Sequence, residues 1–363
     1  MNFCDLAVSG VADLRPYQPG KPIEELQRQH GIRDVIKLAS NENPLGPSKA
    51  ALAAIALNSR ELSRYPDGNG FSLKTALAEK FQLQTKQITL GNGSNDILEM
   101  IARCFLSPQD EVIVSEHAFA IYALVAQAIG ATSVVTPALN YGHDLQAMLA
   151  AVTERTKLIF IANPNNPTGT LLSAAELHQF LQQLPAHVLV VLDEAYVEYN
   201  NEASKSFDWL VQFSNLIVTR TFSKAYGLAG LRVGFAVSDP AITDLLNRVR
   251  QPFNVNNLAL AAAVASLNDE DYLIESRAVN VAGMQQYEQG FKQLGLKWIP
   301  SSGNFITVDV GRSAADVYEA LLQRGVIVRP IAAYGLPKHL RISIGLEADN
   351  ARCLKALAEV LES

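Results

Sequence analysis

One lysine and one arginine lie in an unusually glycine-rich and apolar stretch, "TRTFSKAYGLAGLRVGF", at residues 219–235. Lys224 follows Ser223 where an apolar run ends, and Arg232 comes eight residues later. A partly desolvated lysine is a usable amine for a Schiff base with an aldehyde cofactor. An arginine can hold a phosphate through paired hydrogen bonds. A lone lysine at such a place more often extends into solvent, so its surroundings must decide.

Pyridoxal phosphate needs an amine for its aldehyde, a carboxylate for its ring nitrogen, a donor for its phenolate oxygen and a phosphate site. The stretch "VLDEAYVEY" offers Asp193 and Tyr196 for the second and third of these roles. An ionised Asp193 would keep the pyridine nitrogen protonated. Taken alone, this carboxylate is more simply explained as a helix cap or a loop residue.

A phosphate site is predicted in "GNGSNDILEMIARCF", where Gly93, Ser94 and Asn95 begin an amphipathic helix. Free N–H groups and the positive end of the helix dipole favour an anion there. An ordinary capped helix without a ligand explains the same residues equally well. In "NPNNPTG", Asn166 could donate to the ring oxygen of the cofactor, although the loop could also be turn chemistry alone.

Six short apolar runs rich in β-branched residues predict the strands that position these side chains. They cover residues 111–115, 132–136, 158–162, 188–192, 215–219 and 232–237. Helical patterns separate several of them, which is typical of an α/β domain with a mostly parallel sheet covered by helices. Ligands in such sheets bind beyond the carboxyl ends of the strands. The candidate residues follow those ends, so we expect them to share one rim.

The texture of the sequence changes after about residue 270, where a long polar helical segment leads into strands and one further helix. We therefore expect a large cofactor-binding domain at residues 46–270 and a small α+β domain at 271–363. The loop-rich residues 1–45 are predicted to form an arm that packs with the small domain.

The composition indicates which kinds of partner and which cellular location to expect. The formal net charge is −6 and the 30 basic residues form no run, which disfavours nucleic acid and anionic membranes. Three cysteines without a Cys-x-x-Cys, and six histidines without metal spacing, predict neither a disulfide framework nor a metal site. No signal segment or membrane-spanning run is apparent. We expect a cytoplasmic protein that acts on small molecules.

Together, Asp193-x-x-Tyr196, Ser223-Lys224, Arg232 and "NNPTG" resemble the motifs of the fold type I pyridoxal-phosphate aminotransferases. The match covers most of the chain, and its motifs are several, ordered and correctly spaced. The resemblance implies that Lys224 carries the cofactor, that Asp193 and Tyr196 act with it in catalysis, and that Ser223 and Arg232 bind the phosphate.

Three further stretches are similar to the histidinol-phosphate aminotransferases: residues 16–31, 36–48 and 64–70. The resemblance implies a homodimer in which Tyr65 of "RYPDGNG" reaches the cofactor phosphate of the other subunit. Phe119 occupies the place of a residue that stacks on the cofactor ring. That residue is often tyrosine, so any role of its hydroxyl is lost here.

The same resemblance implies four residues that bind substrate. Arg341 in "LRISIG" matches the arginine that binds the substrate carboxylate, and Arg329 in "VIVRP" could supply a second cation. Asn43 in "NENPLG" matches a residue near the substrate, although it could be a plain loop asparagine. Tyr17 lies in the N-terminal segment that we expect to fold over the site.

The implied reaction is transamination between L-histidinol phosphate and 2-oxoglutarate, giving imidazole acetol phosphate and glutamate, in histidine biosynthesis. An aromatic amino-acid aminotransferase or a threonine-phosphate decarboxylase would share much of this pattern. A transcription regulator with an aminotransferase-like domain, or a nucleotide-binding α/β protein, is a non-enzymatic alternative. The former should bring a DNA-binding domain, for which no room precedes residue 16, and the latter would lack a cofactor absorption band.

Overall fold

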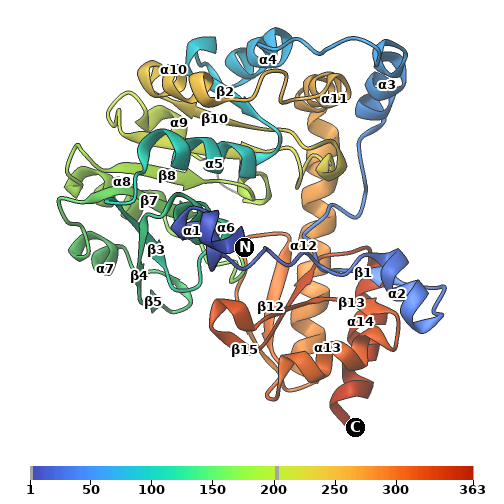
Figure 1. Ribbon diagram of the computed structural model, residues 1–363. Helices are drawn as coiled ribbons and strands as arrows, with labels where there is room; N and C mark the ends of the chain where they lie inside the picture. Colours follow the sequence, from blue (N-terminus) through green and yellow to red (C-terminus); the bar gives the residue numbers. More distant parts are fainter. Residues whose placement is uncertain (1–2, 201–203, 363) are drawn as a thin grey trace.

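The computed structural model describes residues 3–200 and 204–362. The long helix α12 (Glu270–Gln293) runs between a large layered unit and a smaller one that contains the C-terminus (Figure 1). The small unit contacts the large unit at residues 166–167, where Arg341 donates to Asn166 Oδ1 and Thr307 donates to the Pro167 carbonyl.

The large unit is built on a seven-stranded sheet with the order β2-β10-β9-β8-β7-β3-β4. Strand β10 runs antiparallel to both of its neighbours, and the ladders among β9, β8, β7, β3 and β4 are parallel. The mostly parallel sheet predicted from the sequence is therefore confirmed. The strands are β2 (Ile88–Gly91), β3 (Glu111–Ser115), β4 (Thr132–Thr136), β7 (Thr156–Ala162), β8 (Leu189–Asp193), β9 (Leu216–Thr221) and β10 (Gly234–Ser238).

Both faces of the central strands are buried, which explains why these strands read as continuous apolar runs. On β3, Val112 and Val114 pack on one face and Ile113 packs on the other, because successive side chains alternate. Helices that cover the first face are α5 (Ser94–Phe105), α6 (Ala120–Ile129) and α10 (Pro240–Val249). Those that contribute to the second core are α3 (Lys49–Asn58), α4 (Phe71–Phe81), α7 (Leu145–Ala150), α8 (Ala174–Gln183), α9 (Ser206–Trp209) and α11 (Asn257–Leu267).

The small unit has a four-stranded antiparallel sheet with the order β11-β12-β15-β14, which packs with α13, α14 and part of α12. Its core joins Ile306 and Leu340 of the sheet to Leu321 and Leu357 of the helices. The elements are β11 (Lys297–Ile299), β12 (Phe305–Asp309), β14 (Arg329–Ile331), β15 (Leu336–Ser343), α13 (Ala314–Leu322) and α14 (Glu347–Glu362).

The N-terminal segment contacts both units. Strand β1 (Ile36–Lys37) pairs with β13 (Val326–Ile327), and Leu26 of α2 (Ile23–His30) packs in a cluster with Leu322. Helix α1 (Ser9–Ala12) instead lies on α6 of the large unit (Figure 1). The remaining elements are a hairpin, β5 (Ala138–Leu139) and β6 (Gly142–His143), and the 3₁₀ turns η1 (Phe3–Leu6), η2 (Ser59–Glu61), η3 (Thr85–Gln87), η4 (Val197–Tyr199), η5 (Ala229–Leu231) and η6 (Ala332–Tyr334).

Two predicted strands differ in detail from the structure. Arg232 precedes β10 instead of starting it, and its φ of 56° is left-handed, which no strand residue adopts. The predicted strand "VIVRP" is divided between β13 and β14, which belong to different sheets.

Among the described residues, no helix combines the length and apolar character that crossing a bilayer requires. Across the same residues, no group of three or more potential metal ligands gathers.

Candidate active site

A cavity of about 250 Å³ lies where β7, β8 and β9 end, between the large sheet and the small unit. Most of the site residues expected from the sequence line it. They are Tyr17, Ser94, Asn95, Phe119, Asn166, Asp193, Tyr196, Ser223, Lys224, Arg232, Arg329 and Arg341. A larger hollow of about 610 Å³ lies between α8, η4 and α12, but none of these residues lines it. The smaller cavity is therefore the candidate active site.

Asp193 is the buried carboxylate of the cavity, with 4% of its surface exposed. Its two oxygens accept hydrogen bonds from the Tyr122 hydroxyl at 2.8 Å and the Thr219 hydroxyl at 3.1 Å. Burial raises the pKa of Asp193, and the hydrogen bonds from Tyr122 and Thr219 oppose that shift. The donors therefore favour the ionised carboxylate, the form that can bind a protonated ring nitrogen.

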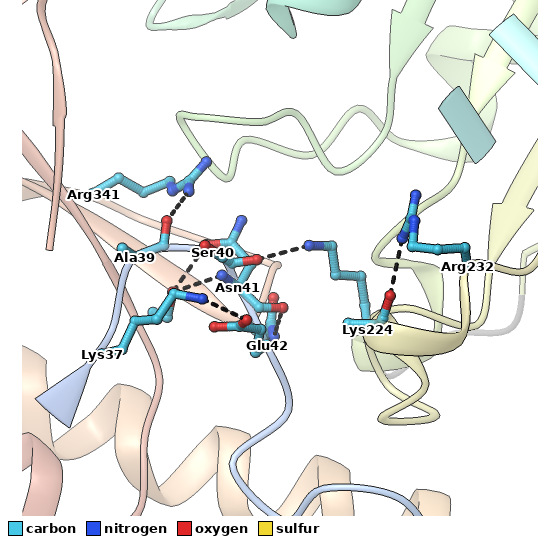
Figure 2. A network of polar contacts seen from close by, with 11 residues as sticks. Lys37, Ala39, Ser40, Asn41, Glu42, Lys224, Arg232 and Arg341 are labelled. Atoms are coloured by element: carbon cyan, nitrogen blue, oxygen red, sulfur yellow. Dashed lines mark hydrogen bonds and ion pairs between the residues drawn. The ribbon is translucent and has the colours of Figure 1, made fainter. Parts of the chain in front are cut away.

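Lys224 comes three residues after the end of β9 and points across the cavity. Figure 2 shows its Nζ donating to the main-chain carbonyl of Ser40, at 2.9 Å. Burial lowers the pKa of Lys224 to about 7, and the positive charge of Arg341 acts in the same direction. An amine with this pKa is available unprotonated near neutral pH, which nucleophilic and proton-transfer chemistry both require.

The lowered pKa makes the stability of the cofactor-free protein depend on pH. The folded pKa of about 7 lies below the ordinary value of 10.5, so the unfolded chain binds more protons between these values. We expect the free energy of unfolding to rise with pH across this window, and Lys224→Met to flatten the rise. Urea unfolding at several pH values measures it, with Lys297→Met on the surface strand β11 as the control. An equal slope in wild type and Lys224→Met would contradict the expectation.

A candidate anion site lies near Lys224, at the start of α5. Ser94 and Asn95 lie in the first turn of this twelve-residue helix, and Arg232 donates to the Ser223 hydroxyl at 3.1 Å. Among the described residues, no carboxylate lies within 4.0 Å of Arg232, so its charge is unpaired there. Gly93 has a φ of 83°, and a Cβ at this position would lie 2.2 Å from the Arg232 guanidinium. Only glycine lets the helix N-terminus and the arginine approach so closely.

Arg341 forms the opposite wall and is only 5% exposed. Its guanidinium donates to Asn166 Oδ1 and to the Ala39 carbonyl, both at 2.6 Å, and its buried Nε has no hydrogen-bond partner among the described residues. Burial lowers the pKa of Arg341 from a starting value so high that the group stays cationic. Arg329 lies opposite Arg341 in the β14–β15 register, with its guanidinium carbon 5.6 Å from the Tyr17 ring centroid. Two cations thus face one side of the cavity.

Three expected site residues lie outside the lining of the cavity. Gly93 acts behind Arg232, as described above. Asn43 donates to the Ala225 carbonyl, the Tyr272 hydroxyl and the Ser276 hydroxyl, so its amide joins the N-terminal segment to α12 and the loop after Lys224. Tyr65 is 81% exposed and stacks on Phe253 with ring centroids 4.7 Å apart.

The structure also adds residues that sequence reasoning missed. Asn41 donates to the Tyr196 hydroxyl at 2.9 Å, and Ser40 and Ala39 supply carbonyls to Lys224 and Arg341. Tyr122 holds Asp193 from α6. The stretch "NENP" contains two asparagines, and either could have been chosen as a site residue. The one that contacts Tyr196 is Asn41, two residues before Asn43. A main-chain carbonyl leaves no signal in the residue types.

Comparison with known proteins shows the family to which the chain belongs. The model of aminotransferase class I and II matches residues 33–357. Proteins named histidinol-phosphate aminotransferase 2, from Pseudomonas fluorescens and Pseudomonas aeruginosa, are 61% and 58% identical over 99% of this chain and 98% and 99% of their own. A crystal structure of histidinol-phosphate aminotransferase from Sinorhizobium meliloti, in complex with pyridoxal-5'-phosphate, superposes with a TM-score of 0.91 at 31% identity, covering 98% of this chain and 97% of that one. This chain therefore belongs to the class I and II aminotransferase family.

Proposed function

We propose that this protein is a pyridoxal-phosphate-dependent histidinol-phosphate aminotransferase of histidine biosynthesis. It exchanges amino groups between L-histidinol phosphate and 2-oxoglutarate. The observation that carries the proposal is the convergence of Lys224, Asp193 and Arg232 on one cavity, with no described carboxylate paired to Arg232. Full-length relatives at 57–61% identity bear the corresponding name.

The residues of the cavity fit this cofactor. The close approach of Gly93 to Arg232 leaves a cradle at the α5 N-terminus that a Cβ would fill, and such a cradle suits a phosphate. Asp193 would hold the ring nitrogen, Tyr196 and Asn166 the phenolate oxygen, and Phe119 one face of the ring. When bound, pyridoxal phosphate supplies an aldehyde that takes up the amino group and a ring that withdraws the electrons of the Cα–H bond.

The chain itself moves the proton and orients the substrate. With a pKa of about 7, the Nζ of Lys224 can accept a proton from the substrate Cα. The same Nζ can then donate that proton again to complete the transfer. The Ser40 carbonyl holds that Nζ in the cavity. Arg341, fixed by Asn166 and Ala39, would bind the anionic group of each substrate. Its Nε, which no described residue accepts from, would be one further donor.

The test is a half-reaction screen of the purified, cofactor-loaded protein. Loss of the visible absorption of the cofactor is followed after adding L-histidinol phosphate, L-glutamate or L-phenylalanine. We expect the first two to react fastest. A clear preference for phenylalanine would favour the aromatic aminotransferase, and release of carbon dioxide from threonine phosphate would favour the decarboxylase. A protein that never develops the absorption band would overturn the cofactor assignment.

We further propose that the enzyme is a homodimer with composite sites. The exposed Tyr65, held by Phe253, is the residue that would reach the partner subunit. A cytoplasmic location and the domain divisions after residues 45 and 270 also remain predictions.

Composite sites predict complementation between two variants whose defects lie in different residues of the site. In a mixed dimer of Lys224→Ala and Tyr65→Phe subunits, one site carries both defects and the other carries neither. Mixing equal amounts should recover about a quarter of wild-type sites, because half of the dimers are mixed. The measurement is activity after subunit exchange, compared with the mean of the separate variants. Activity no higher than that mean, or an active monomer, would contradict the composite site.

A further inference from the structure

Asn41 joins the small unit to the candidate active site. It is 1% exposed, and its φ of 54° lies in the left-handed region, which asparagine tolerates better than other non-glycine residues. Its main-chain N–H donates to the Ser343 hydroxyl at 2.8 Å, and its carbonyl accepts from Asn304 at 2.9 Å. Ser343 ends β15 and Asn304 directly precedes β12, so both partners belong to the small unit.

These bonds decide which way the Asn41 amide points. The Ser343 hydroxyl accepts from the Asn41 N–H and donates to Asn41 Oδ1, at 3.1 Å. The other end of the amide, Nδ2, therefore faces the Tyr196 hydroxyl at 2.9 Å. An amide nitrogen only donates, so the phenol oxygen of Tyr196 must accept this bond. The phenol proton then remains free for another acceptor.

We propose that Asn41 is a positioning residue that turns the phenol proton of Tyr196 toward the bound cofactor and sets the strength of that hydrogen bond from the small unit. This inference rests on the proposed function, since it assigns Tyr196 to the phenolate oxygen of pyridoxal phosphate. A hydroxyl that accepts one hydrogen bond becomes a better donor in the next, because bonds in a chain polarise one another.

The surroundings of Tyr196 support this role. Burial raises the pKa of the phenol to about 12, while the charge of Arg341 and the bond from Asn41 oppose the rise. The neighbouring carbonyl of Ser40 accepts from Lys224 (Figure 2). Because Asn41 contacts Tyr196, one short segment contacts both residues that would act on the cofactor. A shift of the small unit would therefore displace the contacts of Tyr196 and Lys224 through Asn41 and Ser40.

The test compares Asn41→Gly, Tyr196→Phe and the double variant, all loaded with pyridoxal phosphate. Glycine adopts a positive φ freely, so Asn41→Gly removes the amide and keeps the main chain. The pH midpoint of the change in visible absorption is measured. We expect Asn41→Gly to move the midpoint by roughly 0.4 to 1 pH unit, in the direction that Tyr196→Phe moves it. The double variant should move no further than Tyr196→Phe alone, because Asn41 acts through Tyr196.

Two more variants separate positioning from stability. Asn350→Ala removes two buried hydrogen bonds to Gly345 in the small unit, so it should lower the Tm and leave the midpoint unchanged. Ser343→Ala removes the hydroxyl that orients the Asn41 amide, so it should move the midpoint as Asn41→Gly does. This variant tests the inference if Asn41→Gly folds poorly. An unmoved midpoint in both Asn41→Gly and Ser343→Ala, or shifts that add in the double variant, would overturn the inference. A wild-type protein without any absorption band would instead overturn the proposed function, and this inference with it.

Discussion

Lys224→Ala is expected to lower kcat for amino transfer by a factor of at least about 10²–10⁴, the usual contribution of a positioned acid–base group. Burial lowers the pKa of Lys224 to about 7, and this amine lines the cavity beside Asp193 and Tyr196. No other lysine lines this cavity among the described residues, so no neighbour can replace it. The measurement is the rate of 2-oxoglutarate consumption with L-histidinol phosphate, at saturating cofactor.

A matched control and a chemical test accompany this variant. Lys37 appears in the same network (Figure 2), but its Nζ contacts Glu42 at 2.7 Å instead of lining the cavity. Lys37→Ala should therefore retain activity within a few-fold. Borohydride reduction of the yellow protein should bleach it and leave the label on Lys224. Recovery of the label on any other lysine, or near-wild-type activity of Lys224→Ala, would remove the assignment.

The fold could be predicted because its signal is local. Strands such as Leu189–Asp193 are buried on both faces, so they read as unbroken apolar runs. The rim at the strand ends then follows from the geometry of parallel sheets. The direction of β10 could not be predicted, because an apolar run has the same composition whether the strand pairs parallel or antiparallel.

The roles of individual cations were harder to predict. Arg220 and Arg232 both flank Lys224, yet they have different partners. Arg220 is buried in an ion pair with Glu194 and lies over the Phe207 ring, whereas Arg232 is left for the cavity. Side-chain direction on β9 and in the loop after it decides this difference.

Long-range contacts explain why Asn41 was missed. Asn41 and Ser343 are 302 residues apart, and two polar loops that meet across the molecule share no periodicity that a sequence reveals. The resemblance to known aminotransferases named Asn43, whose amide instead joins α12 to the N-terminal segment.

Arg341 and Arg329 are expected to divide substrate recognition between them. Arg341 is buried and held by Asn166 and Ala39, so Arg341→Ala should lower kcat/KM about 10- to 150-fold for both L-histidinol phosphate and L-glutamate, as loss of a charge-assisted hydrogen bond does. The alanine also leaves the Asn166 amide oxygen without its donor.

Arg329 is partly exposed, lies over Tyr17 and donates to the Gln18 carbonyl, so its charge faces the mouth of the cavity. A phosphate dianion in a half-closed site needs more than one cation, whereas an aromatic side chain needs none. Arg329→Ala should therefore lower kcat/KM about tenfold or more for L-histidinol phosphate, and much less for L-phenylalanine. Steady-state rates for both substrates in wild type, Arg329→Ala and Arg329→Lys measure the difference. The lysine keeps the positive charge but cannot form the paired hydrogen bonds of a guanidinium. Equal losses for the two substrates would mean that Arg329 only supports Tyr17, and a wild type that prefers L-phenylalanine would replace the phosphate pocket by an aromatic one.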